Sequence, residues 1–154
     1  MLNTMEIEQI LSSQVVGRLA CRYGDSQYIV PISYAYDGEY VYCHTQEGLK
    51  VRLMREHRKV CFEVESMPDM ANWRTVIAWG EFEELKDWDS RMIAMNKLHE
   101  RILPMISSET LQLSVDWPFS PTELDRIPGV TFRIRLLEKS GRFEKAEPTV
   151  FFGS

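Results

Sequence analysis

The stretch from Tyr28 to Lys50 constrains the fold more than any other part of the chain. Two apolar, strand-like runs flank Asp37-Gly38, and an Asp-Gly pair between such runs is a strong signal for a β-hairpin. A two-residue loop at this point fixes which residues face each other across the two strands. The expected cross-strand pairs are Pro31 with His44, Ser33 with Tyr42, and Ala35 with Tyr40.

The two faces of this expected hairpin differ in character. One face has small residues on its first strand opposite His44 and Tyr42, which leaves room for a flat ligand. A hairpin buried on both faces is the simpler alternative. Pro31 cannot donate a hydrogen bond to a sheet, so it requires an edge strand or a bulge. The residues expected in the core are Val30, Ile32, Tyr34, Val41 and Cys43.

The rest of the sequence predicts a mainly β domain with helices. Strands that follow one another with few crossover helices favour antiparallel pairing, and a small closed barrel fits best. In the first strand, either Val15, Gly17, Leu19 and Cys21 or the alternate set faces the core. The expected helices cover residues 3–12, 48–57 and 87–103. The expected strands cover residues 14–23, 28–36, 39–44, 60–65, 73–85 and 130–138, with a turn at Ser140-Gly141 and a long irregular segment over 107–128.

Length and composition limit the partners and the compartment. A chain of 154 residues predicts one domain, spanning residues 1–154. The net charge of −5 argues against nucleic acid as a partner, because neutralising phosphates requires a basic surface. Three isolated cysteines without a CxxC pair indicate a reducing, cytoplasmic environment. No apolar run is long enough to cross a membrane.

Motifs for several common chemistries are missing, which leaves an anion site as the candidate. The sequence has no GxSxG, HExxH, GxGxxG or GxxxxGK[ST] motif, and its three histidines predict no metal site. Thr45, the amides near Gly48, and Lys50 gather at a predicted helix N-terminus, where a phosphate is favoured. Arg74, with Thr75 beside it, is a second candidate cation if the fifth strand lies nearby.

A series of short motifs resembles the FMN-binding split-barrel family, known as the pyridoxamine 5′-phosphate oxidase-like group. Within that group the sequence is most similar to the nitroimidazole-resistance type of flavoprotein. The resemblance covers roughly residues 10 to 85, and the order of the motifs carries it rather than any single one. The motifs are Gly17–Ala20, Tyr28–Tyr34, Tyr42–Thr45 with Gly48 and Lys50, Val60–Val64, and Trp73–Val76 with Trp79-Gly80.

The resemblance implies an α+β fold built on a six-stranded antiparallel split β-barrel, and a homodimer with FMN at the subunit interface. It also assigns three groups of residues to the flavin. Pro31, Ile32, Ser33 and Tyr34 are expected to line the isoalloxazine ring, and His44, Thr45 and Lys50 to reach the ribityl phosphate or the ring edge. Trp73, Arg74 and Thr75 are expected to complete the site, from the same subunit or from the other.

The expected function is that of a small FMN-dependent oxidoreductase acting on a small molecule. His44 is the candidate catalytic residue, as a hydrogen-bond partner or proton donor beside the flavin. The basic C-terminal signature of pyridoxamine phosphate oxidases is not evident, so oxidation of vitamin B6 is not expected. Alternatives are a barrel that binds deazaflavin or haem, a flavin carrier or sensor without turnover, and an interaction module. Residues 117–119, Trp-Pro-Phe, are a candidate site cover or dimer contact.

Overall fold

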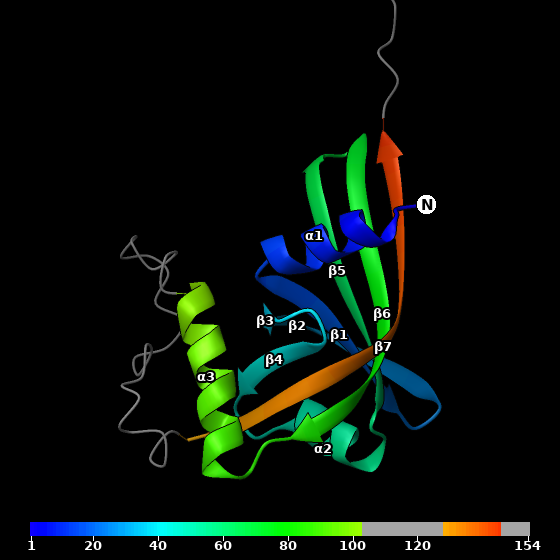
Figure 1. Ribbon diagram of the computed structural model, residues 1–154. Helices are drawn as coiled ribbons and strands as arrows, with labels where there is room; N and C mark the ends of the chain where they lie inside the picture. Colours follow the sequence, from blue (N-terminus) through cyan, green and yellow to red (C-terminus); the bar gives the residue numbers. More distant parts are fainter. Residues whose placement is uncertain (103–127, 146–154) are drawn as a thin grey trace, which may run out of the picture.

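The structure is a computed structural model, and it describes residues 1–102 and 128–145. Within these ranges the helices are α1 (Thr4–Ser13), α2 (Leu49–Glu56) and α3 (Trp88–Ile102). The strands are β1 (Val16–Tyr23), β2 (Ser26–Ser33), β3 (Ala35–Tyr36), β4 (Tyr40–Thr45), β5 (Lys59–Asp69), β6 (Asn72–Glu84) and β7 (Val130–Lys145) (Figure 1). None of the helices in this described part is long and apolar enough to cross a membrane.

The strands form one antiparallel sheet that closes into a split barrel. Their order is β2-β1-β5-β6-β7-β4-β3, so β2 and β3 lie at the two ends of the sheet. These two strands are also consecutive in the chain, with only Tyr34 between them. The chain itself therefore joins the two edges, and the barrel is split between β2 and β4. The predicted fold class is confirmed, and seven strands replace the expected six because Tyr34 interrupts the second one.

The interior of the barrel follows the strand alternation that the sequence predicts. Gly17, Leu19 and Cys21 of β1 are buried, which decides between the two possible faces of that strand. Tyr34 is fully buried; its hydroxyl donates to the carbonyl oxygen of Leu11 at 2.7 Å, and its ring meets Phe62 edge-on at 5.0 Å. The other fully buried side chains of the barrel include Val41, Cys43, Val51, Met54, Val76, Ala78, Phe132 and Ile134.

The helices cover different parts of this barrel (Figure 1). Helix α1 lies across one end, held by Ile7, Ile10 and Leu11, and α2 lies at the other end, directly after β4. Helix α1 starts with a capping box, in which Asn3 and Glu6 each accept a hydrogen bond from the backbone of the other. Helix α3 packs on the outside of the barrel against β4 and β7.

The predicted pairing around Asp37-Gly38 is wrong. Ala35 pairs with Tyr42, whereas Pro31 pairs with Arg18 of β1 and His44 with Thr131 of β7. The reason lies in the turn, where the Asp37 carboxylate accepts hydrogen bonds from the backbone amides of Glu39 and Tyr40 at 2.9 and 2.7 Å. This Asx turn spans four residues and needs a positive φ only at Gly38, whereas a type I′ turn needs two.

Two further predictions about the C-terminal half have different outcomes. The turn expected at Ser140-Gly141 is wrong, because β7 continues without interruption to Lys145 and pairs with β6 over its whole second half. Gly141 instead marks a close approach: a Cβ there would lie 2.9 Å from side-chain atoms of Leu2 and Ile7. The irregular segment and residues 117–119 lie outside the described residues, apart from Pro128.

Candidate functional site

The predicted anion cradle lies at the start of α2. Gly48 is the N-cap of this helix, and no side chain caps it, whereas Asn3 caps α1 and Asp87 accepts from the Ser90 amide at the start of α3. The first-turn amides of α2 therefore have no side-chain acceptor. Lys50 stands in the same turn and is half-buried. Thr45, the last residue of β4, comes three positions before Gly48, so the residues predicted for a phosphate all belong to the connection from β4 into α2.

The charge of Lys50 acts on two cysteines of the barrel. Burial raises the pKa of the Cys21 thiol to about 11, and the positive charge of Lys50 opposes that rise. Burial also raises the pKa of the Cys43 thiol, and the Lys50 charge opposes that rise too. These two cysteines belong to β1 and β4. Within the described residues Lys50 has no hydrogen-bond or ion-pair partner of its own.

The four residues predicted to line a ring alternate between two environments. Pro31 is exposed and Ser33 is half-buried, and both point to the outer side of β2. Ile32 is 7% exposed and Tyr34 is 0% exposed, so their side chains belong to the core. Because β2 is an end strand of the sheet, Pro31 satisfies the predicted requirement for an edge. A flat ligand on this edge would touch Pro31, Ser33 and backbone atoms.

The side chain of His44 points to the outer face of β4, away from the barrel interior, and lies beneath α3. Its Nδ1 atom lies 3.1 Å from the hydroxyl oxygen of Thr131, and that hydroxyl donates to the sulfur of Met95 at 3.8 Å. Gly129 packs so closely that a Cβ there would be 3.1 Å from the imidazole Nε2 atom. Burial lowers the pKa of His44; a hydrogen bond to the backbone of Pro128 opposes the shift, and the Arg91 charge adds to it. The imidazole is therefore neutral at neutral pH.

Trp73, Arg74 and Thr75, the site residues predicted from the strand over residues 73–85, do not all lie on one face of β6. Trp73 and Thr75 follow the outward positions of β6, whereas Arg74 follows the inward ones, beyond the end of the barrel. Thr75 donates to a carboxylate oxygen of Glu63 at 2.8 Å, and Glu63 also pairs with Arg18 at 3.3 Å. The indole N–H of Trp73 donates to Glu144 at 3.1 Å. In a single subunit none of these three is placed with the α2 cradle.

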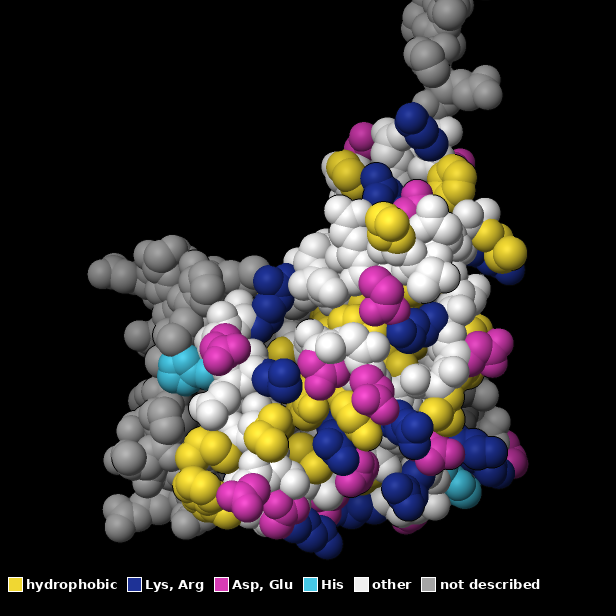
Figure 2. Space-filling model, viewed as in Figure 1, with side chains coloured by type: hydrophobic (Ala, Val, Ile, Leu, Met, Phe, Trp, Pro, Cys, Tyr) yellow, Lys and Arg dark blue, Asp and Glu magenta, His cyan; other side chains and the backbone are white. Residues whose placement is uncertain are grey.

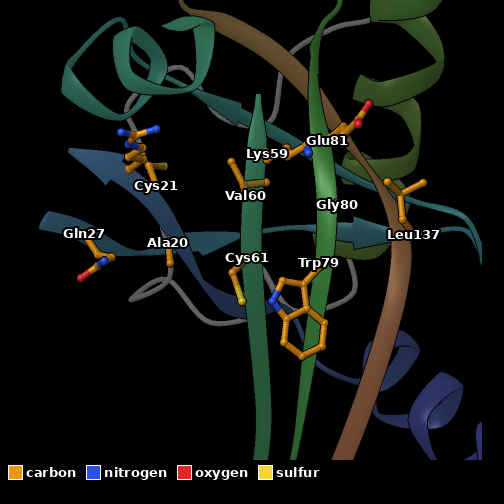
Figure 3. A pocket seen from close by; sticks show the side chains of 11 residues that line it. Ala20, Cys21, Gln27, Lys59, Val60, Cys61, Trp79, Gly80, Glu81 and Leu137 are labelled. Atoms are coloured by element: carbon orange, nitrogen blue, oxygen red, sulfur yellow. The ribbon is translucent and has the colours of Figure 1, made fainter. Parts of the chain in front are cut away.

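An apolar stripe crosses the outer face of the sheet, and sequence reasoning missed it. Cross-strand pairing aligns Ile29 with Ala20, Ala20 with Cys61, and Cys61 with Trp79, and a bulge on β7 adds Leu137 beside Trp79. Figure 3 shows the Trp79 indole beside the Cys61 thiol. Ala20, Cys61, Trp79 and Leu137 of this stripe line a trough of about 430 Å³. The sequence did carry a signal for this stripe. In a strand with one face in the core and one face in solvent, the solvent-facing positions are usually polar, but here several of them are apolar.

Comparisons with known proteins give the same fold. Residues 3–142 match the family model described as pyridoxamine 5′-phosphate oxidase. The chain belongs to this family. The resemblance first seen over residues 10 to 85 thus extends through α3 and most of β7.

Solved structures of this family and its relatives superpose along nearly the whole chain. A FAD-binding protein from Mesorhizobium loti is 26% identical, with a TM-score of 0.73 and coverage of 94% of this chain and 96% of that one. A candidate 5-nitroimidazole antibiotic resistance protein from Bacteroides thetaiotaomicron is 14% identical, with a TM-score of 0.70 and coverage of 93% and 85%. A FAD and haem binding protein from Mycobacterium smegmatis is 15% identical, with a TM-score of 0.73 and coverage of 96% and 74%. At such identities the last two show the fold alone.

A curated relative adds sequence similarity over a shorter stretch. An uncharacterized protein of Rhizobium meliloti is 34% identical over 80 residues. This match spans 52% of the chain and about half, 53%, of the relative's length. The assignment of this chain to the pyridoxamine 5′-phosphate oxidase family therefore rests on the family model. The solved structures support the split-barrel fold.

Proposed function

We propose that this protein binds FMN and is a small oxidoreductase that acts on a small molecule. One observation carries the proposal: the N-terminus of α2 has no side-chain cap, carries Lys50 in its first turn and directly follows β4, which borders the split in the barrel. Backbone amides, a positive helix dipole and one ammonium suit a phosphate. The outer side of Pro31 and Ser33 at the edge of β2 offers a flat surface for a ring.

The solved relatives support a flavin in general terms. The Mesorhizobium loti protein, which is 26% identical, binds FAD, and FAD contains the ring and first phosphate of FMN. The cradle of this chain has one lysine and one threonine, which match a single phosphate. We therefore propose FMN, with Thr45 and Lys50 at the phosphate and with Pro31, Ser33 and the backbone of Ile32 and Tyr34 at the ring.

We also propose a homodimer that forms through the outer face of the sheet. Ile29, Trp79 and Leu137 are exposed by 62%, 43% and 59%, and an apolar stripe of this kind marks a protein interface. Charges of both signs flank the stripe, with Arg18 and Glu63 on one side and Lys59 and Glu81 on the other. A patch that contains both signs can pair with a second copy of itself around a two-fold axis. Trp73 and Thr75 share this face, so a partner would bring them to the flavin.

The division of chemistry follows from these contacts. A bound flavin supplies the electron transfer, and the protein supplies binding, orientation and exclusion of water. The predicted catalytic role of His44 stays a prediction. Its contacts with Thr131 and Gly129 fix the end of β4 and so the position of Thr45, which gives it a positioning role.

The spectrum of the purified protein tests the proposal. A bound flavin gives absorption bands near roughly 370 and 450 nm. We expect a yellow protein that releases FMN on denaturation and elutes as a dimer in light scattering. Protein that is colourless and cannot be reconstituted with FMN or FAD would reject the proposal, and a Soret band would favour a haem protein instead.

Turnover separates an enzyme from a carrier. We expect steady oxidation of NADH or NADPH when a quinone or nitroaromatic acceptor is present. Flavin that is bound in equal stoichiometry but shows no turnover with either donor would favour a carrier or sensor.

A further inference from the structure

A groove of about 440 Å³ opens beside α1, at the end of the barrel away from the α2 cradle. It exists because β5, β6 and β7 continue beyond the point where α1 crosses the sheet (Figure 1). Its walls come from Ile10 and Ser13 of α1 and from Ser66, Arg74 and Phe143 of the three strands. Figure 2 shows hydrophobic and charged side chains together on this extension of the sheet.

Strand register places an arginine and an aromatic ring side by side in the groove. Ser66 pairs with Arg74, and Arg74 pairs with Phe143, so all three side chains point to the face that α1 covers. Directly opposite side chains in a sheet start about 5 Å apart. At Gly141 the helix touches the strand, and two residues farther on Phe143 is 53% exposed. The groove thus has an aromatic wall beside a cation.

The groove is lined by two carboxylates and two cations, and they differ in their contacts. The carboxylates have hydrogen-bond donors, because Glu6 accepts from the Asn3 amide at 2.9 Å and Glu144 accepts from the Trp73 indole at 3.1 Å. Arg74 and Lys145 have no hydrogen-bond or ion-pair partner in residues 1–102 and 128–145. The guanidinium of Arg74 faces the groove and has no partner in this described part of the chain, so it is available to a ligand.

We propose that this groove binds a small aromatic carboxylate. The carboxylate would sit on Arg74, whose planar guanidinium matches it with two parallel hydrogen bonds. The ring would lie against Phe143, and the hydroxyls of Ser13 and Ser66 line the polar side. The volume falls within the range of small-molecule sites. This site goes beyond the proposed flavin function, and it removes Arg74 from the set predicted to contact the flavin.

An NMR titration of the 154-residue chain with benzoate tests the proposal. The neutral isostere benzamide is the ligand control, since it keeps the ring and loses the charge. Backbone amides report binding in the groove, and the indole N–H of Trp73 reports on the outer face of the sheet. The variants are Arg74→Gln and, as a matched control, Arg142→Gln, which removes the same charge one residue from Phe143 on the opposite face of β7.

The expected result is saturable benzoate binding, with the largest shifts at Ser66, Arg74 and Phe143 and an affinity about five- to tenfold above that of benzamide. Arg74→Gln should abolish this preference, whereas Arg142→Gln should keep it, and FMN affinity should be unchanged in both. The proposal is overturned by the absence of saturable shifts in the groove, or by equal effects of the two variants. Weaker FMN binding in Arg74→Gln would also overturn it, because it would return Arg74 to the flavin site.

Discussion

The end of β4 has two faces, and the residues on them differ in how their polar groups are used. His44 lies under α3 in contact with Thr131 and Gly129, and its pKa is lowered by burial. Thr45, its neighbour in the sequence, leads into the start of α2, where no side chain caps the helix and Lys50 has no partner among the described residues. The face with His44 is closed by the protein's own contacts, and we call it the closed face. The face with Thr45 and the start of α2 is the open face.

This difference indicates what each face does. Polar groups that find partners inside the protein contribute to folding. Groups that stay without partners at a helix N-terminus cost stability and are commonly retained where a ligand uses them. Substitutions on the closed face should therefore change the free energy of unfolding, and substitutions on the open face should change ligand affinity.

The largest effect is expected at Gly129 on the closed face. Gly129 has a φ of +112°, and a Cβ there would lie 2.6 Å from the Thr45 carbonyl oxygen. Gly129→Ala should lower the free energy of unfolding by about 3 kcal/mol, through backbone strain and overpacking. Urea denaturation measures this.

Gly48→Ala is the matched substitution on the open face. A Cβ at Gly48 would approach nothing nearer than the Gln46 carbonyl oxygen at 4.0 Å, and its extended φ of 178° suits any residue. The free energy of unfolding should change by less than about 1 kcal/mol. If both glycines proved equally sensitive, the contrast between the faces would be lost.

The second prediction concerns Lys50. Lys50→Ala should weaken FMN binding by roughly 1.5–3 kcal/mol, because it removes a charge-assisted contact with the phosphate. The stability of the free protein should change little. Arg52→Ala, an exposed position on the same helix, is the control and should leave FMN affinity intact. Unchanged FMN affinity in Lys50→Ala would show that the start of α2 does not bind the FMN phosphate.

The third prediction returns to the closed face at Tyr42. Its hydroxyl donates to the Asp37 carboxylate at 2.9 Å, and burial together with this carboxylate raises the pKa of Tyr42 to about 12. Tyr42→Phe should cost about 1 kcal/mol of unfolding free energy and should not affect FMN affinity. A loss of FMN affinity without a loss of stability would contradict the division of roles.

The smallest effect is a pH dependence that comes from His44. Its folded pKa is lowered from 6.5, so the unfolded chain binds the proton more tightly. The stabilising contribution is complete above the unfolded value, is lost as the pH falls toward the folded value, and then levels off. The measurement compares unfolding of the wild type and His44→Gln between about pH 5 and 8, where the expected difference is under about 1 kcal/mol. Parallel stability profiles would show that His44 does not titrate in this way.

Local patterns predicted much of the fold. The start of α1 at Asn3 and the start of α2 at Gly48 each depend on residues close in the sequence, and each is confirmed. The alternation in β1 left two faces possible, and the structure shows that Leu19 and Cys21 are buried. The pairing of Pro31 was predicted wrongly because it depends on β1 rather than on the nearby turn. Register between distant strands depends on the closure of the barrel, which no local pattern encodes.

The candidate site divides in the same way. The association of Thr45, Gly48 and Lys50 followed from a strand that leads into a helix, so the sequence predicted it. The outward stripe through Cys61 and Trp79 could not be predicted, because it requires the registers of several strands at once. Arg74 and Thr75 point to opposite faces of β6, as the alternation of a strand predicts. The sequence does not show which of these two faces packs against α1.

The most direct test of the central claim is a titration of the cofactor-free protein with FMN and with riboflavin, followed by flavin fluorescence. Both ligands offer the ring to β2, but only FMN offers a phosphate to the start of α2. The account predicts saturable binding of one FMN per chain, with riboflavin weaker by a factor of about ten or more. Equal affinities for the two ligands, or no saturable binding of FMN, would contradict it.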